Sequence, residues 1–531
     1  TEEKDRVFEK VRTQKGAKIQ GADIIPATQL YTEPYMVKFL VQNSLGATWV
    51  GMQPDTQLME GWEYFVRDAD RAPVEKKPVQ AITFLDPACG SGHFLIEAFD
   101  LFYAMYEEEG HLTEPEAICR SILEKNLFGI DIDERAVQIA AAALWMKAAE
   151  KAFEFGGAAK NLVATNIRLP KGKDHLEEFL KEHPEDKPIR PALEVIFEGL
   201  AHADELGSLL QIEEPVEREF KHLKETDDRA RSHGTTQGDL FRPTAVQDQL
   251  PFGIESYDEW RKKTVAALKE HFAAEAESAD LGQAFFGQSV GKGLVLFDLL
   301  SRRYDVVAAN PPYMGSKHLN THQKKYLQMR YPAGKRDLYA MFMIRSVALS
   351  KKTARIAMVT RHSWLFLKYF EMLRGNQENP NYGILYQSTI ETLVHLGPHA
   401  FSEIGGEIVN TVLFTLLNTP PQHDSKFSAI RVVDAPSLEK KQSQLKRVLQ
   451  GELEALRSFP EQLSFTKMPL SQIMYWLPKK FLNVFLTHLP LKYQATVREG
   501  LHTSNSYRFV RFAWECADSR GQQRWVKYAK G

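Results

Sequence analysis

Cysteine is scarce in this chain, with only Cys89, Cys119 and Cys516 among 531 residues. Their small number and wide spacing argue against a disulfide framework and favour a reducing compartment, so the cytoplasm is the expected location. The sequence also lacks an apolar run of about 18 residues, and it does not open with a signal-peptide pattern. These absences exclude a disulfide-stapled secreted domain and predict no membrane association.

An excess of charge is lacking as well, because the formal net charge of the chain is −2. Basic residues are nevertheless concentrated in two segments. Residues 315–370 contain twelve Lys/Arg and one acid, Asp337, and residues 477–531 contain ten basic and three acidic side chains. A single basic run is usually a solvated surface. Two such runs favour a polyanionic partner whose phosphates they would neutralise.

Short apolar segments alternate with helical patterns in two parts of the chain. We expect strands over residues 82–85, 127–131, 162–165, 304–309, 355–360, 392–396 and 409–416. We expect helices over residues 94–106, 134–153 and 337–350. This alternation predicts an α/β fold with a doubly wound, mostly parallel sheet, and ligands bind beyond the carboxyl ends of the strands in such a sheet.

Residues 86–92, Asp-Pro-Ala-Cys-Gly-Ser-Gly, form a glycine-rich turn between an expected strand and an expected helix. Gly90 and Gly92 allow the backbone to approach a ligand closely, and the Asp86 carboxylate suits a cationic amino group. Asp131 ends the next strand, where a carboxylate can accept both hydroxyls of a ribose. It lies 45 residues after Asp86, which is too far for the dinucleotide-binding pattern. A tight turn without a ligand is the alternative interpretation.

A second motif, Asn310-Pro311-Pro312-Tyr313, follows the strand expected over 304–309. It places a side-chain amide, two rigid prolines and an aromatic ring at a strand end. The two motifs resemble those that define amino-group DNA methyltransferases dependent on S-adenosylmethionine. Their order resembles the gamma class of adenine-N6 enzymes. The resemblance covers residues 29–417 and implies the class I methyltransferase fold.

Within that class, three segments are most similar to the PglX family, the adenine methyltransferases of BREX phage-exclusion systems: residues 14–45, 310–315 and 500–509. Related fused restriction-modification enzymes share this layout and remain an alternative. In both groups a segment like 500–509 precedes a target-recognition domain, so we expect this chain to hold the catalytic half and only the start of that domain. The resemblance implies double-stranded DNA as partner, together with other subunits of a phage-defence system.

The resemblance also assigns roles to individual residues. Implied cofactor contacts are Thr32, Pro34, Asp86, Pro87, Ala88, Cys89, Gly90, Gly92, Asp131, Ile132, Asn166 and Asn310. Asn166 stands where the family usually has an aspartate that touches the cofactor adenine. Implied catalytic residues are Asn310, Pro311, Pro312 and Tyr313, and implied contacts to the target base are Tyr313 and Phe401. Lys317, Lys324, Lys325 and Arg336 are expected to contact the DNA backbone.

The expected chemistry is transfer of a methyl group to the exocyclic nitrogen of an adenine flipped out of the duplex. The Asn310 side-chain carbonyl and the Pro311 backbone carbonyl would accept the two N–H groups, and Tyr313 would stack on the base. We expect no metal to be required. The same tetrapeptide serves protein glutamine methyltransferases, which are one alternative. A catalytically silent DNA-binding subunit and a fused nuclease are others.

A hydrophobic content of 43% is typical of a globular protein. The length of 531 residues is sufficient for two or three domains. We divide it into an N-terminal helical segment (1–80), a cofactor-binding half (81–170), a helical insertion with a mobile loop (171–300) and a catalytic half (301–420). Residues 421–531 are expected to form a helical connector, with a helix over 438–458, and the start of the target-recognition region.

Overall fold

The computed structural model describes residues 31–69, 73–153, 159–167, 190–233, 256–276, 281–375, 382–402 and 409–489, with a few isolated residues beyond these ranges. The mobile loop was expected over 225–249: residues 225–233 instead belong to a helix, Glu213–His233, and residues 234–249 lie outside the described ranges, as does the segment 500–509. Two compact units are present, residues 1–476 and 477–531. The first holds the whole sheet, and helix α19 (Lys479–Thr487) lies in the second.

Within the described residues, one sheet has the strand order β3-β2-β1-β4-β5-β7-β6-β8-β9. Its strands are β1 Phe84–Asp86, β2 Leu127–Asp131, β3 Leu162–Ala164, β4 Tyr304–Ala309, β5 Ser350–Arg361, β6 Thr389–Gly397, β7 Thr411–Leu417, β8 Ser428–Arg431 and β9 Arg457–Ser458. Strands β1 to β5 pair in parallel, and β7 runs antiparallel between β5 and β6. The expected α/β fold with a mostly parallel sheet is confirmed.

The order in which the chain visits the strands creates a switch point. The chain begins at β1, moves outward to β3 and then returns to β4 on the other side of β1. Ligands bind at such switch points because the loops after the two central strands diverge there. Both sequence motifs follow these central strands, one after β1 and one after β4.

Helices of the first part of the chain form much of the core. They are α3 Pro34–Val41, α4 Ala47–Met52, α5 His93–Glu109, α6 Pro115–Ser121 and α7 Glu134–Lys151. Helix α3 contacts α5 and strands β5 and β7, and six of its eight residues are buried. Its almost wholly apolar sequence therefore fits an interior helix rather than an amphipathic surface helix.

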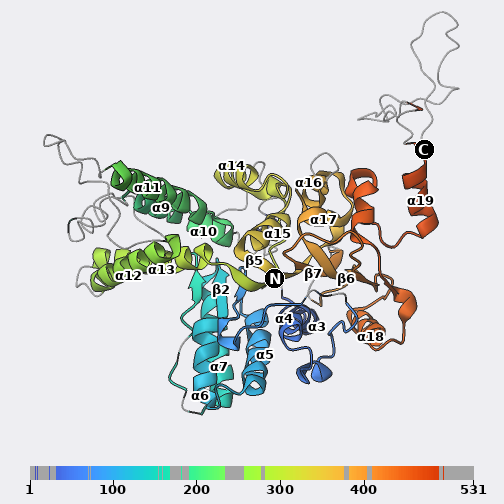
Figure 1. Cartoon of the computed structure of the whole chain (residues 1–531), viewed down its shortest axis with the longest axis horizontal. Helices are drawn as coiled ribbons and strands as arrows, with labels where there is room; N and C mark the ends of the chain where they lie inside the picture. Colours follow the sequence, from blue (N-terminus) through green and yellow to red (C-terminus); the bar gives the residue numbers. More distant parts are fainter. Residues whose placement is uncertain are drawn as a thin grey trace, which may run out of the picture. The chain divides into compact units, whose positions relative to one another are not determined.

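The insertion contains helices that pack on one another (Figure 1). They are α9 Arg190–Leu200, α10 Ala203–Leu206, α11 Glu213–His233, α12 Tyr257–Ala276 and α13 Leu281–Ser301. Helix α13 also contacts β3, and the turn Gly207–Leu209 contacts β2 and the later helix α15 (Leu338–Leu349). The insertion is thus attached to the sheet in its described part.

The other helices that follow β4 are α14 Thr321–Arg330, α16 Glu371–Arg374, α17 Ile384–Gln387 and α18 Leu438–Leu449. The expectation of one helix over 438–458 is wrong. Gly451, with φ of +80°, takes a left-handed conformation just past Leu449, and the chain then reaches β9. Strands β8 and β9 extend the sheet past residue 420. No helix in the described ranges is both long and apolar enough to cross a membrane.

Candidate active site

The turn after β1 requires its two glycines. Gly90 and Gly92 have φ values of +50° and +89°, which residues with a Cβ rarely adopt. A Cβ at Gly92 would also lie 2.8 Å from the Cβ of Ala140, so the close approach of α5 and α7 depends on this glycine. The Cys89 N–H donates to the Ile130 carbonyl at 3.0 Å, which ties the turn to β2.

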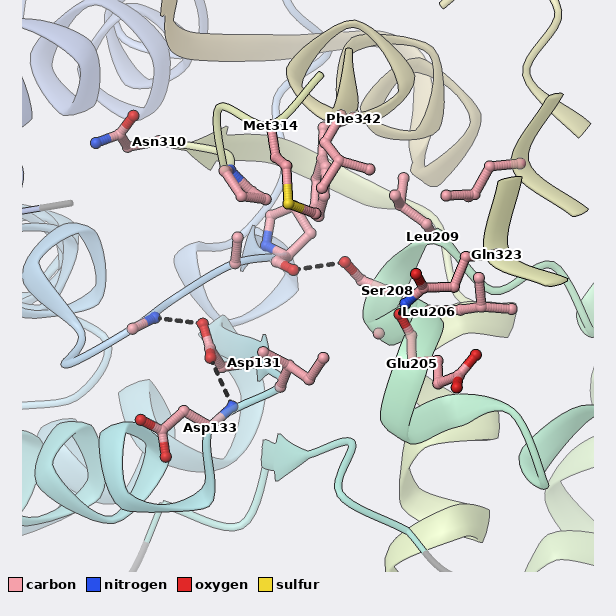
Figure 2. A pocket seen from close by; sticks show the side chains of 18 of the residues that line it. Asp131, Asp133, Glu205, Leu206, Ser208, Leu209, Asn310, Met314, Gln323 and Phe342 are labelled. Carbon is pink, nitrogen blue, oxygen red and sulfur yellow. Dashed lines mark hydrogen bonds between the residues drawn. The ribbon is translucent and has the colours of Figure 1, made fainter. Parts of the chain in front are cut away.

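Asp131, at the end of β2, joins two neighbouring loops. Its Oδ2 accepts from the Gly90 N–H at 2.8 Å, and its Oδ1 accepts from the Asp133 N–H at 2.9 Å (Figure 2). Burial raises the pKa of this carboxyl, and the two backbone donors oppose that shift. Asp131 therefore fixes the glycine turn from the adjacent strand.

Asp86 is buried at the other end of the turn, with 1% of its surface exposed. Its Oδ1 accepts from the Ala88 N–H at 3.0 Å, while Oδ2 has no hydrogen-bond partner among the described residues. Burial, with a smaller contribution from the charge of Asp131, raises the pKa of Asp86 well above its ordinary value. An unpaired buried carboxylate oxygen is costly, so this site fits a ligand with a cationic amino group.

The side chain of Asn310 is held between two hydroxyl groups. Its Nδ2 donates to Thr32 Oγ1 at 3.0 Å, and its Oδ1 accepts from the Tyr313 hydroxyl at 2.9 Å. Thr32 is buried just before α3. In this orientation the carboxamide nitrogen faces Thr32 and the carboxamide oxygen faces Tyr313. Thr32, which was expected to contact a cofactor, here contacts the catalytic candidate Asn310.

The ring of Tyr313 is partly buried and packs against the main apolar cluster, which includes Phe401 with 7% exposure. It also meets the Tyr339 ring edge-on, with centroids 6.1 Å apart. Burial raises the pKa of Tyr313 well above 10, so its hydroxyl stays a donor. Ser402 donates through its N–H and its hydroxyl to Glu33 Oε1, both at 2.7 Å, which attaches the Phe401 loop to the Thr32 segment.

A cavity of about 160 Å³ opens between the two motif turns. From the predicted site its lining includes Pro87, Ala88, Gly90, Asp131, Ile132, Asn310 and Pro312. Later residues in the lining are Met314, Leu319, Gln323, Leu327, Leu338 and Phe342. Figure 2 shows Asn310 and Asp131 on different sides of this space, on the β4 and β2 ends. The two turns therefore open on the same side of the sheet.

One wall of the cavity comes from the insertion, which sequence reasoning missed. Residues 205–209, here called the strap, line it together with the motif turns. Ser208 Oγ donates to the Pro87 carbonyl at 2.6 Å (Figure 2). The signal that could have indicated the strap is the apolar stretch 206–212, Leu-Gly-Ser-Leu-Leu-Gln-Ile, which lies between Glu-rich helical segments.

The strap is fixed by buried groups from the catalytic half. Arg345, in α15, donates from Nε to the Ser208 carbonyl at 2.9 Å and from Nη2 to the Leu210 carbonyl at 2.8 Å. The same guanidinium pairs with the buried carboxylate of Glu213. The Tyr331 hydroxyl donates to the Leu209 carbonyl at 2.7 Å. Segments more than 100 residues apart in sequence thus form one wall.

The cavity lining does not include every predicted site residue. Asn166 is exposed and donates to Glu134 Oε2 at 2.7 Å. The other predicted residues absent from the described lining are Thr32, Pro34, Asp86, Cys89, Gly92, Pro311, Tyr313 and Phe401. Three of these hold residues that do line it: Thr32 and Tyr313 contact Asn310, and Asp86 accepts from the Ala88 N–H.

The basic segment 315–370 divides into surface and core. Lys317, Lys324, Lys325 and Arg336 are exposed, as a contact to a polyanion requires. Arg345 and Arg355 are not, because their side chains are 1% and 0% exposed and pair with Glu213 and Glu391. The sequence count therefore overstates the surface charge of this segment: a buried arginine is a structural ion-pair partner.

A model of the Eco57I restriction-modification methylase family matches residues 125–401, more than half of the chain. The chain belongs to this family. The model of the MmeI DNA-methyltransferase domain matches residues 72–174, so the two matches together span both motif turns. The sheet described above is the methyltransferase fold expected for this family.

Two relatives are similar over nearly the whole chain. The adenine-specific methyltransferase BrxX of Escherichia coli O9:H4 is 30% identical over 100% of this chain and 41% of its own length. The adenine-specific methyltransferase PglX of Lacticaseibacillus casei is 31% identical over 96% of this chain and 39% of its own length. The chain thus spans about two fifths of these relatives. Among solved structures, the DrdV–DNA complex has a TM-score of 0.44 at 13% identity, covering 85% of this chain and 31% of that one.

Proposed function

We propose that this chain is the methyl-transferring part of an adenine-N6 DNA methyltransferase that uses S-adenosylmethionine. The observation that carries the proposal is that Gly90, Asp131 and Asn310 line one cavity at the switch point of the sheet. This position would bring the turn proposed to hold the cofactor and the Asn310 amide to the same space. The similarity to BrxX and PglX favours the host-marking methylase of a BREX-type defence system as the biological role.

The residues around the glycine turn fit the proposed cofactor. Its amino group would pair with the unpartnered Oδ2 of Asp86, and its ribose would lie at Asp131. When bound, S-adenosylmethionine supplies a methyl group on a positively charged sulfur. Gly90 leaves room for it, because a Cβ there would meet no protein atom within 4 Å in the described part of the chain.

Asn310 would then bind the amine that receives the methyl group. Its Oδ1 already accepts one hydrogen bond, from Tyr313, and an adenine N–H would replace that donor. The Pro311 carbonyl would accept the second N–H. Two fixed acceptors localise the nitrogen lone pair toward the methyl carbon, which is electrostatic preorganisation. The amine nitrogen would gain the methyl group that the sulfur loses, and one amine proton would leave to solvent.

The DNA partner is supported by the exposed basic residues after Tyr313. Lys324 and Lys325 lie on the exposed side of α14, whereas Gln323 and Leu327 of the same helix line the cavity. Phosphates held at these lysines would lie on the outer face of a helix that helps to form the cavity. Glutamine-amide methylation offers no reason for this placement.

The proposal is tested by titration calorimetry and by sequencing. The purified chain should bind S-adenosylmethionine and its demethylated product, S-adenosylhomocysteine. Cells carrying the full-length protein should contain N6-methyladenine in one short motif by long-read sequencing. Asn310→Ala should lower methyl transfer by at least about a hundredfold, because a preorganised acceptor is lost. Absence of any binding heat with either ligand would refute the cofactor assignment.

The Asn310→Ala protein provides its own control. Its affinity for S-adenosylhomocysteine should stay within a few fold of the wild type, because Asp86 and Asp131 remain intact. Asn418→Ala is a matched variant that should keep methyl transfer, since Asn418 is also partly buried but donates to Ser350 and Lys351, which do not line the cavity in the described part of the chain. Persistent N6-methyladenine in the Asn310→Ala strain would contradict the role given to this residue.

A further inference from the structure

The strap contributes a carboxylate to the far end of the cavity. Glu205 lines the cavity, and Figure 2 shows it on the opposite side of the view from Asn310, with Asp131 between them. If the reactive methyl group faces Asn310 and the ribose lies at Asp131, the nucleobase of the cofactor extends beyond Ile132 toward the strap. This step rests on the proposed function.

An adenine base presents an amino group there and needs an acceptor. Among the polar side chains of this end, the Ser208 hydroxyl donates its hydrogen to the Pro87 carbonyl and offers a ligand only the lone pairs of a neutral oxygen. The Gln323 amide is also occupied: its Oε1 accepts from the Asn320 N–H at 3.2 Å, and its Nε2 donates to the Glu205 carbonyl at 3.3 Å. These neutral oxygens are weaker acceptors than a carboxylate. Asp133 also lines the cavity, but Figure 2 shows its side chain on the other side of Asp131 from the strap.

The Glu205 carboxylate is better suited. Its oxygens lie 3.4 Å from Asn320 Nδ2, the long limit of a hydrogen bond, and 3.7 Å from the His322 ring. Its side chain is 30% exposed. A carboxylate has about four lone-pair sites, so these weak contacts leave acceptor capacity for a ligand.

Asn166, the residue expected to touch the adenine, is placed differently. It is exposed, it donates to Glu134, and the described lining of the cavity does not include it. Glu134 also accepts from Lys292 at 2.5 Å. Asn166 and Glu134 thus take part in a hydrogen-bonded network outside the described cavity lining.

We propose that Glu205, supplied by the insertion, is the acceptor for the amino group of the cofactor's adenine. The residue determines cofactor specificity: it distinguishes an adenine, which donates from its amino group, from a hypoxanthine, which has a carbonyl oxygen at the same position. A site built around a hydrogen bond to a ligand group rejects the analogue that lacks the group, because its own acceptor is left unpaired.

The test compares S-adenosylhomocysteine with S-inosylhomocysteine by titration calorimetry. The wild type should prefer the adenine compound at least tenfold. Glu205→Ala should weaken S-adenosylhomocysteine binding about tenfold and leave the inosine compound nearly unchanged, so that the preference disappears. Glu205→Gln keeps the side-chain shape and adds an N–H donor, so it should gain affinity for the inosine compound. Asn166→Ala is the matched control and should keep the wild-type preference.

Any other outcome would contradict either the assignment of Glu205 or the proposed function. A preference unchanged in both Glu205 variants would overturn the assignment of Glu205, and loss of the preference in Asn166→Ala would return that role to Asn166. In both cases the wild type still binds S-adenosylhomocysteine, so the proposed function stands. A wild type that binds neither compound would overturn the proposed function itself and this assignment with it.

Discussion

At the scale of single residues, Asn310 shows how a short motif depends on a distant side chain. An amide can point its oxygen or its nitrogen at a substrate, and the sequence of the motif does not decide which. In the structure Thr32 Oγ1 accepts from Asn310 Nδ2, and Asn310 Oδ1 faces the Tyr313 hydroxyl. Thr32 is therefore a positioning residue for the proposed reaction.

Thr32→Val removes the acceptor and keeps the shape of the side chain. We expect kcat to fall about tenfold, which corresponds to the loss of one hydrogen bond of about 1 kcal/mol or slightly more. Affinity for S-adenosylhomocysteine should change less than twofold. Steady-state methylation of target DNA and calorimetry measure the two quantities. Thr32→Ser should restore kcat; an equal loss of kcat and of cofactor affinity would instead support the original expectation of a cofactor contact.

The sequence predicts residues best where a strand end specifies them. Gly90, Asp131 and Asn310 follow short apolar segments, and all three line the cavity. It fails where the partner is distant: Thr32 and Asn310 are 278 positions apart. It also cannot separate a buried basic residue from an exposed one, because Arg355 and its neighbour Lys352 look equivalent in the basic run.

At the scale of elements, the ends of β5 and β6 are linked by two histidines. His362 Nδ1 and His395 Nε2 are 2.7 Å apart. Burial first, and then the charge of Arg361, lowers the pKa of His362 to about 4. Burial, followed by the neighbouring His362, lowers the pKa of His395 to about 3. Both rings are therefore neutral in the folded protein at pH 7.

This pair predicts a loss of stability in acid. In the unfolded chain both histidines take up protons near pH 6.5, whereas the folded pair does so only near pH 4 and below. Below pH 6.5 the unfolded state binds more protons, so the free energy of unfolding falls as the pH falls, by up to about 1.4 kcal/mol per pH unit for each histidine. Urea titrations between pH 7.5 and 4.5 measure this slope. His395→Gln should flatten it, and equal slopes for both proteins would contradict the assignment.

The bounds of helices and strands were predicted well where no charged residue interrupts the apolar pattern of a strand or the periodic pattern of a helix. Strands β2 and β4 have the predicted bounds, and α7 ends two residues before its predicted end. Strand β5 begins at Ser350, five residues before the expected start, because its charged opening Lys351–Lys352 hides the strand pattern. The domain division itself stays a prediction.

At the scale of the whole molecule, one buried ion pair connects the insertion to the catalytic half. Arg345 and Glu213 are 132 positions apart, with side chains 1% and 4% exposed. Charge patterns in the sequence could not reveal the pair, because Glu213 lies in a Glu-rich stretch of otherwise exposed type. The insertion was expected to be helical with a mobile loop, and its strap also lines the cavity.

Arg345→Met should lower the free energy of unfolding by about 3–5 kcal/mol, because it leaves the Glu213 charge buried and unpaired. Urea denaturation monitored by circular dichroism provides the value. The double variant Arg345→Met/Glu213→Leu should recover much of the loss. Lys221→Met is the matched control: it breaks the exposed pair with Glu217 and should change stability by less than about 1 kcal/mol. A loss as small as that of Lys221→Met would show that the pair is not important for stability.

Helix α14 lines the cavity with one face and exposes lysines on the other. Gln323 and Leu327 face the cavity, and Lys324 and Lys325 face solvent. A short helix moves as a rigid body. A tilt that brings Gln323 and Leu327 closer to a ligand in the cavity therefore also moves Lys324 and Lys325. Suppose that a ligand in the cavity favours one orientation of Lys324 and Lys325. Binding of a polyanion to the lysines in that orientation then raises the affinity of the cavity for its ligand by the same factor, because coupling between two binding sites is reciprocal. Cofactor binding and DNA binding would in that case be coupled through the orientation of helix α14.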